Sequence, residues 1–327
     1  MKDLIQHSIS EQSLTIFLWC TCKPHTLATA TQDSFYPRYL FYDYGIDTPQ
    51  ELHNVLLSSG YYAPATLDDI LSYSNSKQLK AILKENSLKI TGDKATLISR
   101  IKEYIPQSVL EDFQANSHLY SLSTLGSAYV NEHYDCVLLH KYSKWNISLD
   151  ELNHAKSTLN WDSVSFRDAA WRILNERILL HSQEADFDNL YLDIENLSEI
   201  CFDFDNSPLN GVYYLLIAFY LNVNCLEYYP TYKLYHDGVI SKENLYSLQN
   251  GLFILDFWVD KIKKYGNYID SSLIAKTYNF VDYPIKLYTL EDFSNMISEI
   301  IFNNCFDIKK WQNFSQEKFI KFLNSLS

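Results

Sequence analysis

The sequence is poor in residues that interrupt regular structure and has no long apolar run. It contains only 8 Gly and 8 Pro among 327 residues, which argues against extensive low-complexity loops. The longest apolar run, residues 212–221, has about half the length that crosses a bilayer. Lys2, Asp3 and Glu11 near the start do not form the positively charged lead of a signal peptide. We therefore expect no membrane segment.

The motifs of common catalytic and metal sites are also missing. The sequence contains no P-loop, no Gly-rich dinucleotide turn, no Gly-x-Ser-x-Gly elbow and no His-Glu-x-x-His helix. A zinc site is not expected either, because zinc prefers two separated ligand pairs and the only nearby candidates are Cys20, Cys22, His25 and His53. We predict a protein that is not an enzyme, with no catalytic residues, metal or cofactor.

The six cysteines do not form the pattern of a disulfide framework. They are scattered over the chain, which indicates reduced thiols. We expect a cytoplasmic protein. The positions are Cys20, Cys22, Cys136, Cys201, Cys225 and Cys305.

Residues 71–105 carry two short helical patterns with a break between them. Asn75 or Ser76 can cap the first helix, and Gln78 is placed to close a capping box from Asn75. Asp93 can cap the second helix, and Pro106 prevents it from continuing. Apolar residues recur at i, i+3 and i+4 in each half: Leu79, Ile82 and Leu83, then Leu97, Ile98 and Ile101.

This helix–link–helix segment resembles a SAP domain, a module that binds DNA. The family usually has Gly where Ser87 stands, and Ser tolerates a left-handed turn poorly. We therefore expect Asn86 to adopt that conformation instead. The resemblance rests on Leu79-Lys80, Leu83-Lys84, Asn86-Ser87-Leu88, Gly92-Asp93-Lys94 and Leu97-Ile98-Ser99-Arg100-Ile101.

The segment is basic within an acidic chain. Residues 77–102 contain seven Lys or Arg against two acids, whereas the whole chain has a net charge of −13. A local basic island is a typical footprint for phosphate, and Gly92 with the helix start after it could receive a phosphate oxygen. The alternatives are a solvated helix face or a protein contact. The expected DNA-binding residues are Lys80, Lys84, Gly92, Lys94 and Arg100, and the resemblance implies double-stranded, AT-rich DNA.

The rest of the chain is predicted to be mainly α-helical. Thr48-Pro49-Gln50-Glu51 matches the sequence pattern of a capping box, with Pro at the first helical position. A strand at 61–63 would follow this helix, and the pattern resembles part of a winged helix. We expect a small helical domain at 1–66, the SAP-like module at 67–106, a linker or helical segment at 107–146 and an acidic helical array at 147–327.

Two features suggest a second function. The pattern from Tyr120 to Gly126 resembles a segment found after SAP modules in proteins of low-GC Gram-positive bacteria and their phages. Residues 178–232 contain nine acids and no Lys or Arg, which could attract a basic host protein such as a nuclease. The alternative function is a phage counter-defence inhibitor with a partly DNA-mimicking surface; the plainer alternative is a solvated acidic face. The candidate partner-binding residues are Glu184, Asp186, Asp188, Asp193, Glu195, Asp203 and Asp205.

Overall fold

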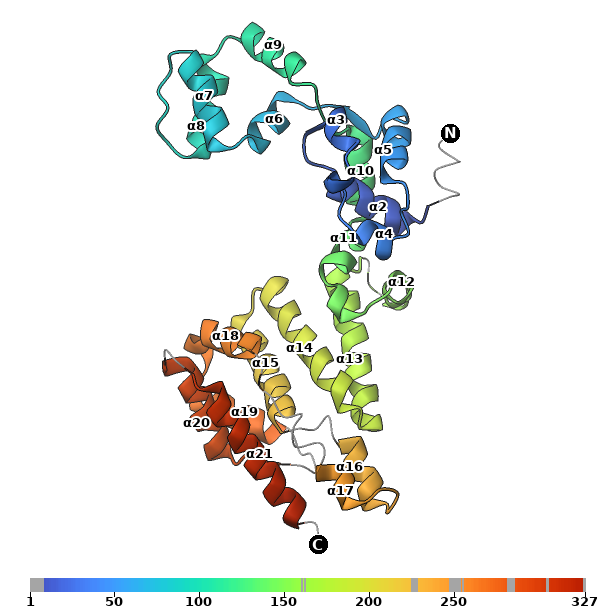
Figure 1. Ribbon diagram of the computed structural model, residues 1–327, viewed down its shortest axis with the longest axis vertical. Coiled ribbons are helices and arrows are strands. Elements are labelled where there is room, and N and C mark those ends of the chain that lie inside the picture. Colours follow the sequence, from blue (N-terminus) through green and yellow to red (C-terminus); the bar gives the residue numbers. More distant parts are fainter. Residues whose placement is uncertain are drawn as a thin grey trace. The chain divides into compact units, whose positions relative to one another are not determined.

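The computed structural model confirms the mainly α-helical class and divides the chain into two compact units, Met1–Ser143 and Lys144–Ser327. We call them the N-terminal and C-terminal units (Figure 1). The structure describes residues 9–159, 161, 163–224, 229–246, 254, 256–280, 286–303 and 306–325.

The N-terminal unit consists of short helices and three very short strands. Its elements in chain order are α2 (Glu11–Cys20), β1 (His25–Thr26), α3 (Leu27–Ala30), the 3-10 helix η1 (Asp33–Phe35), α4 (Tyr39–Tyr42), α5 (Pro49–Ser58), β2 (Tyr62–Pro64), α6 (Leu67–Tyr73), α7 (Ser76–Glu85), α8 (Lys94–Tyr104), α9 (Gln107–Ser117), β3 (Leu119–Leu122), α10 (Thr124–Glu132) and α11 (Tyr134–Lys141).

The strands form one antiparallel sheet in the order β1-β3-β2. Thr26 pairs with Leu119, and Tyr62 pairs with Leu122, so the last strand lies between the first two. Apart from the short elements η1 and α4, the succession α2, β1, α3, α5, β2, β3 with this strand order resembles the connectivity of a winged helix.

The segment 107–146, expected to be a linker or a helical segment, contains the helices α9, α10 and α11 and the strand β3. Its strand β3 completes the sheet, and α10 and α11 pack against α2. Val130 and Val137 share one buried cluster with Phe17 and Leu18. Sequence patterns could not show this, because the two halves of the cluster are separated by more than a hundred residues.

Residues 65–118, between β2 and β3, carry a separate hydrophobic core. Helices α7 and α8 pack against each other, and α6 packs against α9 (Figure 1). The buried residues of this core do not belong to the cluster under the sheet. They are Leu71, Leu79, Leu83, Leu97, Ile101, Ile105 and Leu110.

In the C-terminal unit, all regular elements among the described residues are helices. A 3-10 helix, η2 (Ser143–Trp145), crosses the boundary. The elements that follow are α12 (Leu149–Thr158), α13 (Phe166–Glu184), α14 (Phe187–Asp203), α15 (Pro208–Val223), α16 (Tyr229–His236), α17 (Lys242–Tyr246), α18 (Asp256–Lys264), the 3-10 helix η5 (Gly266–Tyr268), α19 (Ser271–Phe280), α20 (Leu290–Phe302) and α21 (Ile308–Ser325).

The apolar helix α15 is the centre of this unit, since it packs against α14, α18 and α19. The ring of Phe219 in α15 packs at a tilt against those of Trp258 and Phe293, and all three side chains are fully buried. Helices α17 and α18 lie before and after residues 247–253, which are outside the described residues. Among the described residues, no helix combines the length and apolarity needed to cross a bilayer.

Candidate nucleic-acid interface

Helix α7 begins and ends with side-chain caps that the sequence encodes. Gln78 N donates to Asn75 Oδ1 at 3.0 Å, and Asn75 N donates to Gln78 Oε1 at 2.8 Å. This reciprocal pair is the capping box predicted from the sequence. At the other end, Asn86 Nδ2 donates to the carbonyl oxygen of Ile82 at 2.8 Å. Both caps satisfy backbone groups that a helix leaves unpaired, so α7 is firmly delimited.

The turn after α7 differs from the expectation. Ser87 adopts the left-handed conformation, with φ of 56°, while Asn86 remains at −96°. Leu88 N then donates to the carbonyl oxygen of Leu83 at 2.8 Å, which is the closing bond of a Schellman turn. The hydrogen bond of Asn86 to the preceding turn keeps that residue right-handed, so Ser87 occupies the position where the family usually has Gly.

Gly92 sets the approach of the link to α8. Its φ of +133° is a conformation that side chains rarely adopt, and an added Cβ would lie 2.8 Å from Thr96 Cγ2. Asp93 follows as the N-cap, and its side chain accepts from Thr96 N at 2.8 Å. The requirement for glycine is therefore structural, and the Asp93 carboxylate occupies part of the helix start that was expected to receive phosphate.

Three lysines form an exposed cationic face on α7. Lys77, Lys80 and Lys84 are spaced i, i+3 and i+7, which places them on one side of the helix. All three side chains are exposed, and among the described residues none of them has an ion-pair or hydrogen-bond partner. We call Lys77, Lys80 and Lys84 the cationic face. Lys80 and Lys84 were expected as DNA contacts; Lys77 was missed, although its spacing in the sequence gives the signal.

The other two cations expected to contact DNA are engaged within the module. Lys94 Nζ donates to the carbonyl oxygen of Ser72 at 2.5 Å. Arg100 Nη1 donates to the carbonyl oxygens of Lys89 and Thr91 at 2.5 and 2.9 Å. These bonds connect α8 to α6 and to the link, so both residues hold the module together, and a role in phosphate binding would have to compete with these contacts.

Two of the seven expected partner-binding acids of the C-terminal unit are buried. Asp193 and Glu195 are buried, with 5% and 6% of their surfaces exposed. Glu195 Oε1 accepts from Lys261 Nζ at 3.0 Å, and burial raises the pKa of Asp193 to about 6, although Arg177 and His181 act in the opposite direction. One buried carboxylate is thus paired with a lysine, and the other takes up a proton at a higher pH than an exposed aspartate does.

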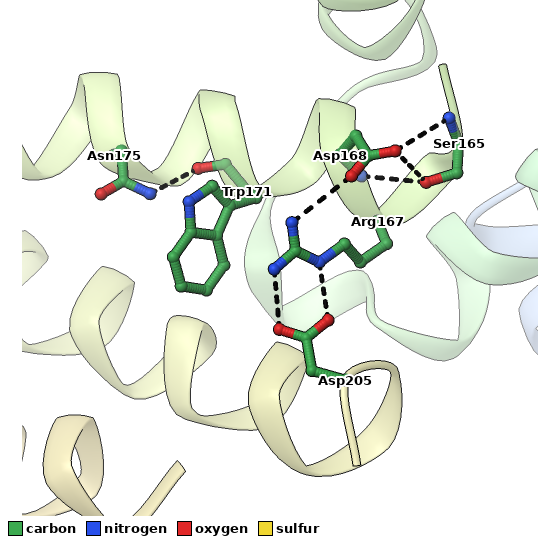
Figure 2. A network of polar contacts seen from close by, with 6 residues as sticks. All are labelled: Ser165, Arg167, Asp168, Trp171, Asn175 and Asp205. Atoms are coloured by element: carbon green, nitrogen blue, oxygen red, sulfur yellow. Dashed lines mark hydrogen bonds and ion pairs between the residues drawn. The ribbon is translucent and has the colours of Figure 1, made fainter. Parts of the chain in front are cut away.

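Two further acids are held by side chains of their own unit. The Asp205 carboxylate accepts two hydrogen bonds from the Arg167 guanidinium, one from Nε and one from Nη2, both at 2.7 Å (Figure 2). Asp186 caps α14 and lies 3.4 Å from His181. Glu184, Asp188 and Asp203 are exposed. The seven expected partner-binding acids therefore do not all lie on the surface.

Of the four residues considered as zinc ligands, the two histidines lie next to each other. His25 Nε2 and His53 Nε2 are 3.3 Å apart in the buried core of the N-terminal unit. Burial lowers the pKa of His53 to about 4, with a further contribution from His25. Cys20 and Cys22 are free thiols. Within the described ranges, no group of three or more His, Cys, Asp or Glu residues lies close enough to hold a metal ion.

The module is the part of the chain that comparison with known proteins identifies. No curated protein and no solved structure matches the chain. The matched residues, 74–106, contain α7, the link and α8, which are the elements that carry the cationic face and the Ser87 turn. This segment of the chain is a SAP domain.

Proposed function

We propose that the protein binds double-stranded DNA without catalysis, through the cationic face of α7. The observation that carries this proposal is the set of three exposed lysine side chains on one side of a capped helix. Lys77 and Lys84 are seven residues apart, so the face extends over about 10 Å of helix. Unpartnered ammonium groups can take up phosphate without first breaking an internal contact, and the SAP match supports nucleic acid as the ligand.

The binding would depend on the phosphate backbone rather than on base sequence. Lysine is a flexible point charge, and phosphate contacts position a protein without reading bases. The cationic face contains no Asn, Gln or Arg suited to bidentate base recognition. We therefore expect weak discrimination between sequences. A preference for AT-rich duplexes follows only from the resemblance to the family.

The proposal is tested by titrating a fluorescent duplex with the intact protein and with two triple variants. Lys77→Ala/Lys80→Ala/Lys84→Ala removes the cationic face. Its control, Lys233→Ala/Lys309→Ala/Lys321→Ala, removes three exposed lysines of the C-terminal unit and changes the net charge equally. We expect at least about a tenfold loss of affinity in the first variant only. Equal losses in both variants, or no binding by the intact chain at low salt, would refute the proposal.

The alternative function, a phage counter-defence inhibitor with an acidic DNA-mimicking surface, is less well supported. Such a surface needs contiguous exposed carboxylates, and Asp193, Glu195 and Asp205 are buried or paired. The exposed Glu184 and Asp188 fit a solvated face equally well. A stoichiometric complex with a nuclease, recovered by pull-down from the natural host, would favour the inhibitor instead.

A further inference from the structure

The SAP domain is inserted between two neighbouring strands of the sheet. Pro64 at the end of β2 pairs with Tyr120 of β3, and Ala65 N donates to the carbonyl oxygen of Leu119 at 2.8 Å. The chain therefore leaves the sheet and returns to it at one place, as in a hairpin. In a winged helix, this hairpin is the wing. We call residues 66–118 the insert, and the remaining described part of the N-terminal unit, 9–65 and 119–143, the body.

Few polar contacts connect the insert to the strands that bear it. Gln114 Nε2 of α9 donates to the carbonyl oxygen of Ala65 at 3.0 Å. Ser121 Oγ of β3 donates to Asp69 Oδ2 at 3.1 Å. Both contacts lie at the base of the insert, next to the strands. The hydrophobic core of the insert, by contrast, is separate from that of the body. A domain with its own core and adjacent ends can unfold without its host.

The body lacks the charge that a DNA-reading winged helix needs. Its helix α5 precedes β2, where such a fold carries its recognition helix. No Lys or Arg occurs between Arg38 and Lys77, so α5 has none. Its exposed side includes Glu51, Asn54 and Val55. A helix in a DNA groove lies between two phosphate rows, and an acidic helix without a cation is repelled there.

We infer that the insert is an independently folding domain that carries the DNA affinity of the N-terminal unit, and that α5 of the body does not enter a DNA groove. The DNA part of this inference rests on the proposed function; the folding part does not. The insert thus replaces both the wing and the recognition helix as the DNA contact, and the body is left with a neutral to acidic face that holds the insert in place.

Native-state hydrogen exchange on the full chain tests the folding part. Leu83→Ala removes a buried side chain of the insert, and Leu18→Ala does the same in the body. We expect Leu83→Ala to speed exchange at Leu97 and Ile101 at least about 30-fold, while the amides of β3 stay within about threefold of their rates in the unaltered chain. Leu18→Ala should show the reverse. If either variant accelerated exchange similarly at the insert amides and at the β3 amides, the inference that the insert folds independently would be overturned.

Duplex titration with α5 variants of the full chain tests the DNA part. Glu51→Ala and Asn54→Ala change exposed residues of α5, and we expect affinities within about twofold of that of the intact chain. A tenfold or greater loss would place α5 at the DNA and overturn this part while leaving the proposed function standing. If the intact chain binds no duplex, the proposed function and the DNA part of the inference both fail, and the exchange experiment still decides whether the insert folds independently.

A third variant replaces residues 66–118 by Asn-Gly, which closes β2 and β3 as a hairpin. This variant should fold and show no duplex binding at low salt. A folded variant that retains the affinity would also overturn the assignment of DNA binding to the insert.

Discussion

Arg100 donates a hydrogen bond of 2.9 Å to the carbonyl oxygen of Thr91, just ahead of the Gly92 turn. The same Nη1 atom also donates to Lys89. One guanidinium therefore binds two carbonyl oxygens in the middle of the short link, residues 86–93, that joins α7 to α8. This contact gives Arg100 a structural role in the SAP domain, whereas the residues of the cationic face are free to bind a ligand.

Arg100→Ala should lower the stability of the insert by about 1–2 kcal/mol, because two backbone acceptors lose a charged donor. Lys80→Ala, which removes an exposed side chain with no partner among the described residues, should change stability by less than about 0.5 kcal/mol. Hydrogen exchange at the buried residues Leu97 and Ile101 measures both effects. Equal stability of the two variants would show that the Arg100 contacts contribute nothing.

Ser87→Gly should stabilise the insert by about 1 kcal/mol. Ser87 has a φ of 56°, and relief of the left-handed strain exceeds the entropy cost of glycine. Gly92→Ala is the matched opposite change, since its φ is +133° and an added Cβ meets Thr96 at 2.8 Å; this variant should be destabilised. Thermal unfolding and exchange of the insert amides measure both. A less stable Ser87→Gly protein would contradict the assigned turn.

The His53 side chain should make the N-terminal unit sensitive to acid. Burial lowers the pKa of His53 to about 4, whereas an unfolded chain binds the proton near pH 6.5. Between these values the unfolded state holds more protons, so the free energy of unfolding falls as the pH is lowered.

His53→Phe should therefore reduce the loss of stability between pH 7 and pH 5 by about 1–2 kcal/mol. Phe keeps a ring that can stack on Tyr62, as His53 does at 4.4 Å. The unaltered chain, measured at the same two pH values, is the reference. Urea unfolding of the N-terminal unit at the two pH values gives the comparison. An undiminished pH dependence in His53→Phe would contradict a neutral buried His53.

Asp193 should have the opposite effect in the C-terminal unit. Burial raises its pKa to about 6, above the unfolded value near 3.9. The folded state then holds more protons between these values, so stability falls as the pH rises. Asp193→Asn should stabilise the unit at pH 7.5 by about 1–2 kcal/mol, and the exposed control Glu184→Gln should not. Equal destabilisation by Asp193→Asn at pH 5 and pH 7.5 would instead identify the carboxylate as a needed partner of His181, 3.5 Å away.

Local signals made the SAP domain predictable from the sequence. The Asn75 capping box, the two apolar stripes and the stop at Pro106 all act within a few residues, so they can be read directly. The prediction that Asn86 takes the left-handed conformation was wrong. The Asn86 side chain bonds back to Ile82, and the sequence alone does not decide which of the two neighbours, Asn86 or Ser87, turns left-handed.

Non-local relationships could not be predicted in the same way. The insertion depends on pairing of β2 with β3 across the whole SAP domain, and very short strands leave little pattern in a sequence. The expectation of an acidic surface over residues 178–232 failed in part for a related reason. Charge along the chain does not reveal that α14 buries Asp193 and Glu195 while Arg167 reaches Asp205 from another helix.

The most direct test of DNA binding through the cationic face is the salt dependence of duplex affinity. Each lysine that neutralises a phosphate contributes about −0.9 to the slope of log K against log salt. We expect a slope of about −3 for the intact chain, a change of about 0.9 for Lys80→Ala, and a slope near zero for the variant that lacks Lys77, Lys80 and Lys84. An unchanged slope in that triple variant would show that other groups bind the DNA and would contradict the account.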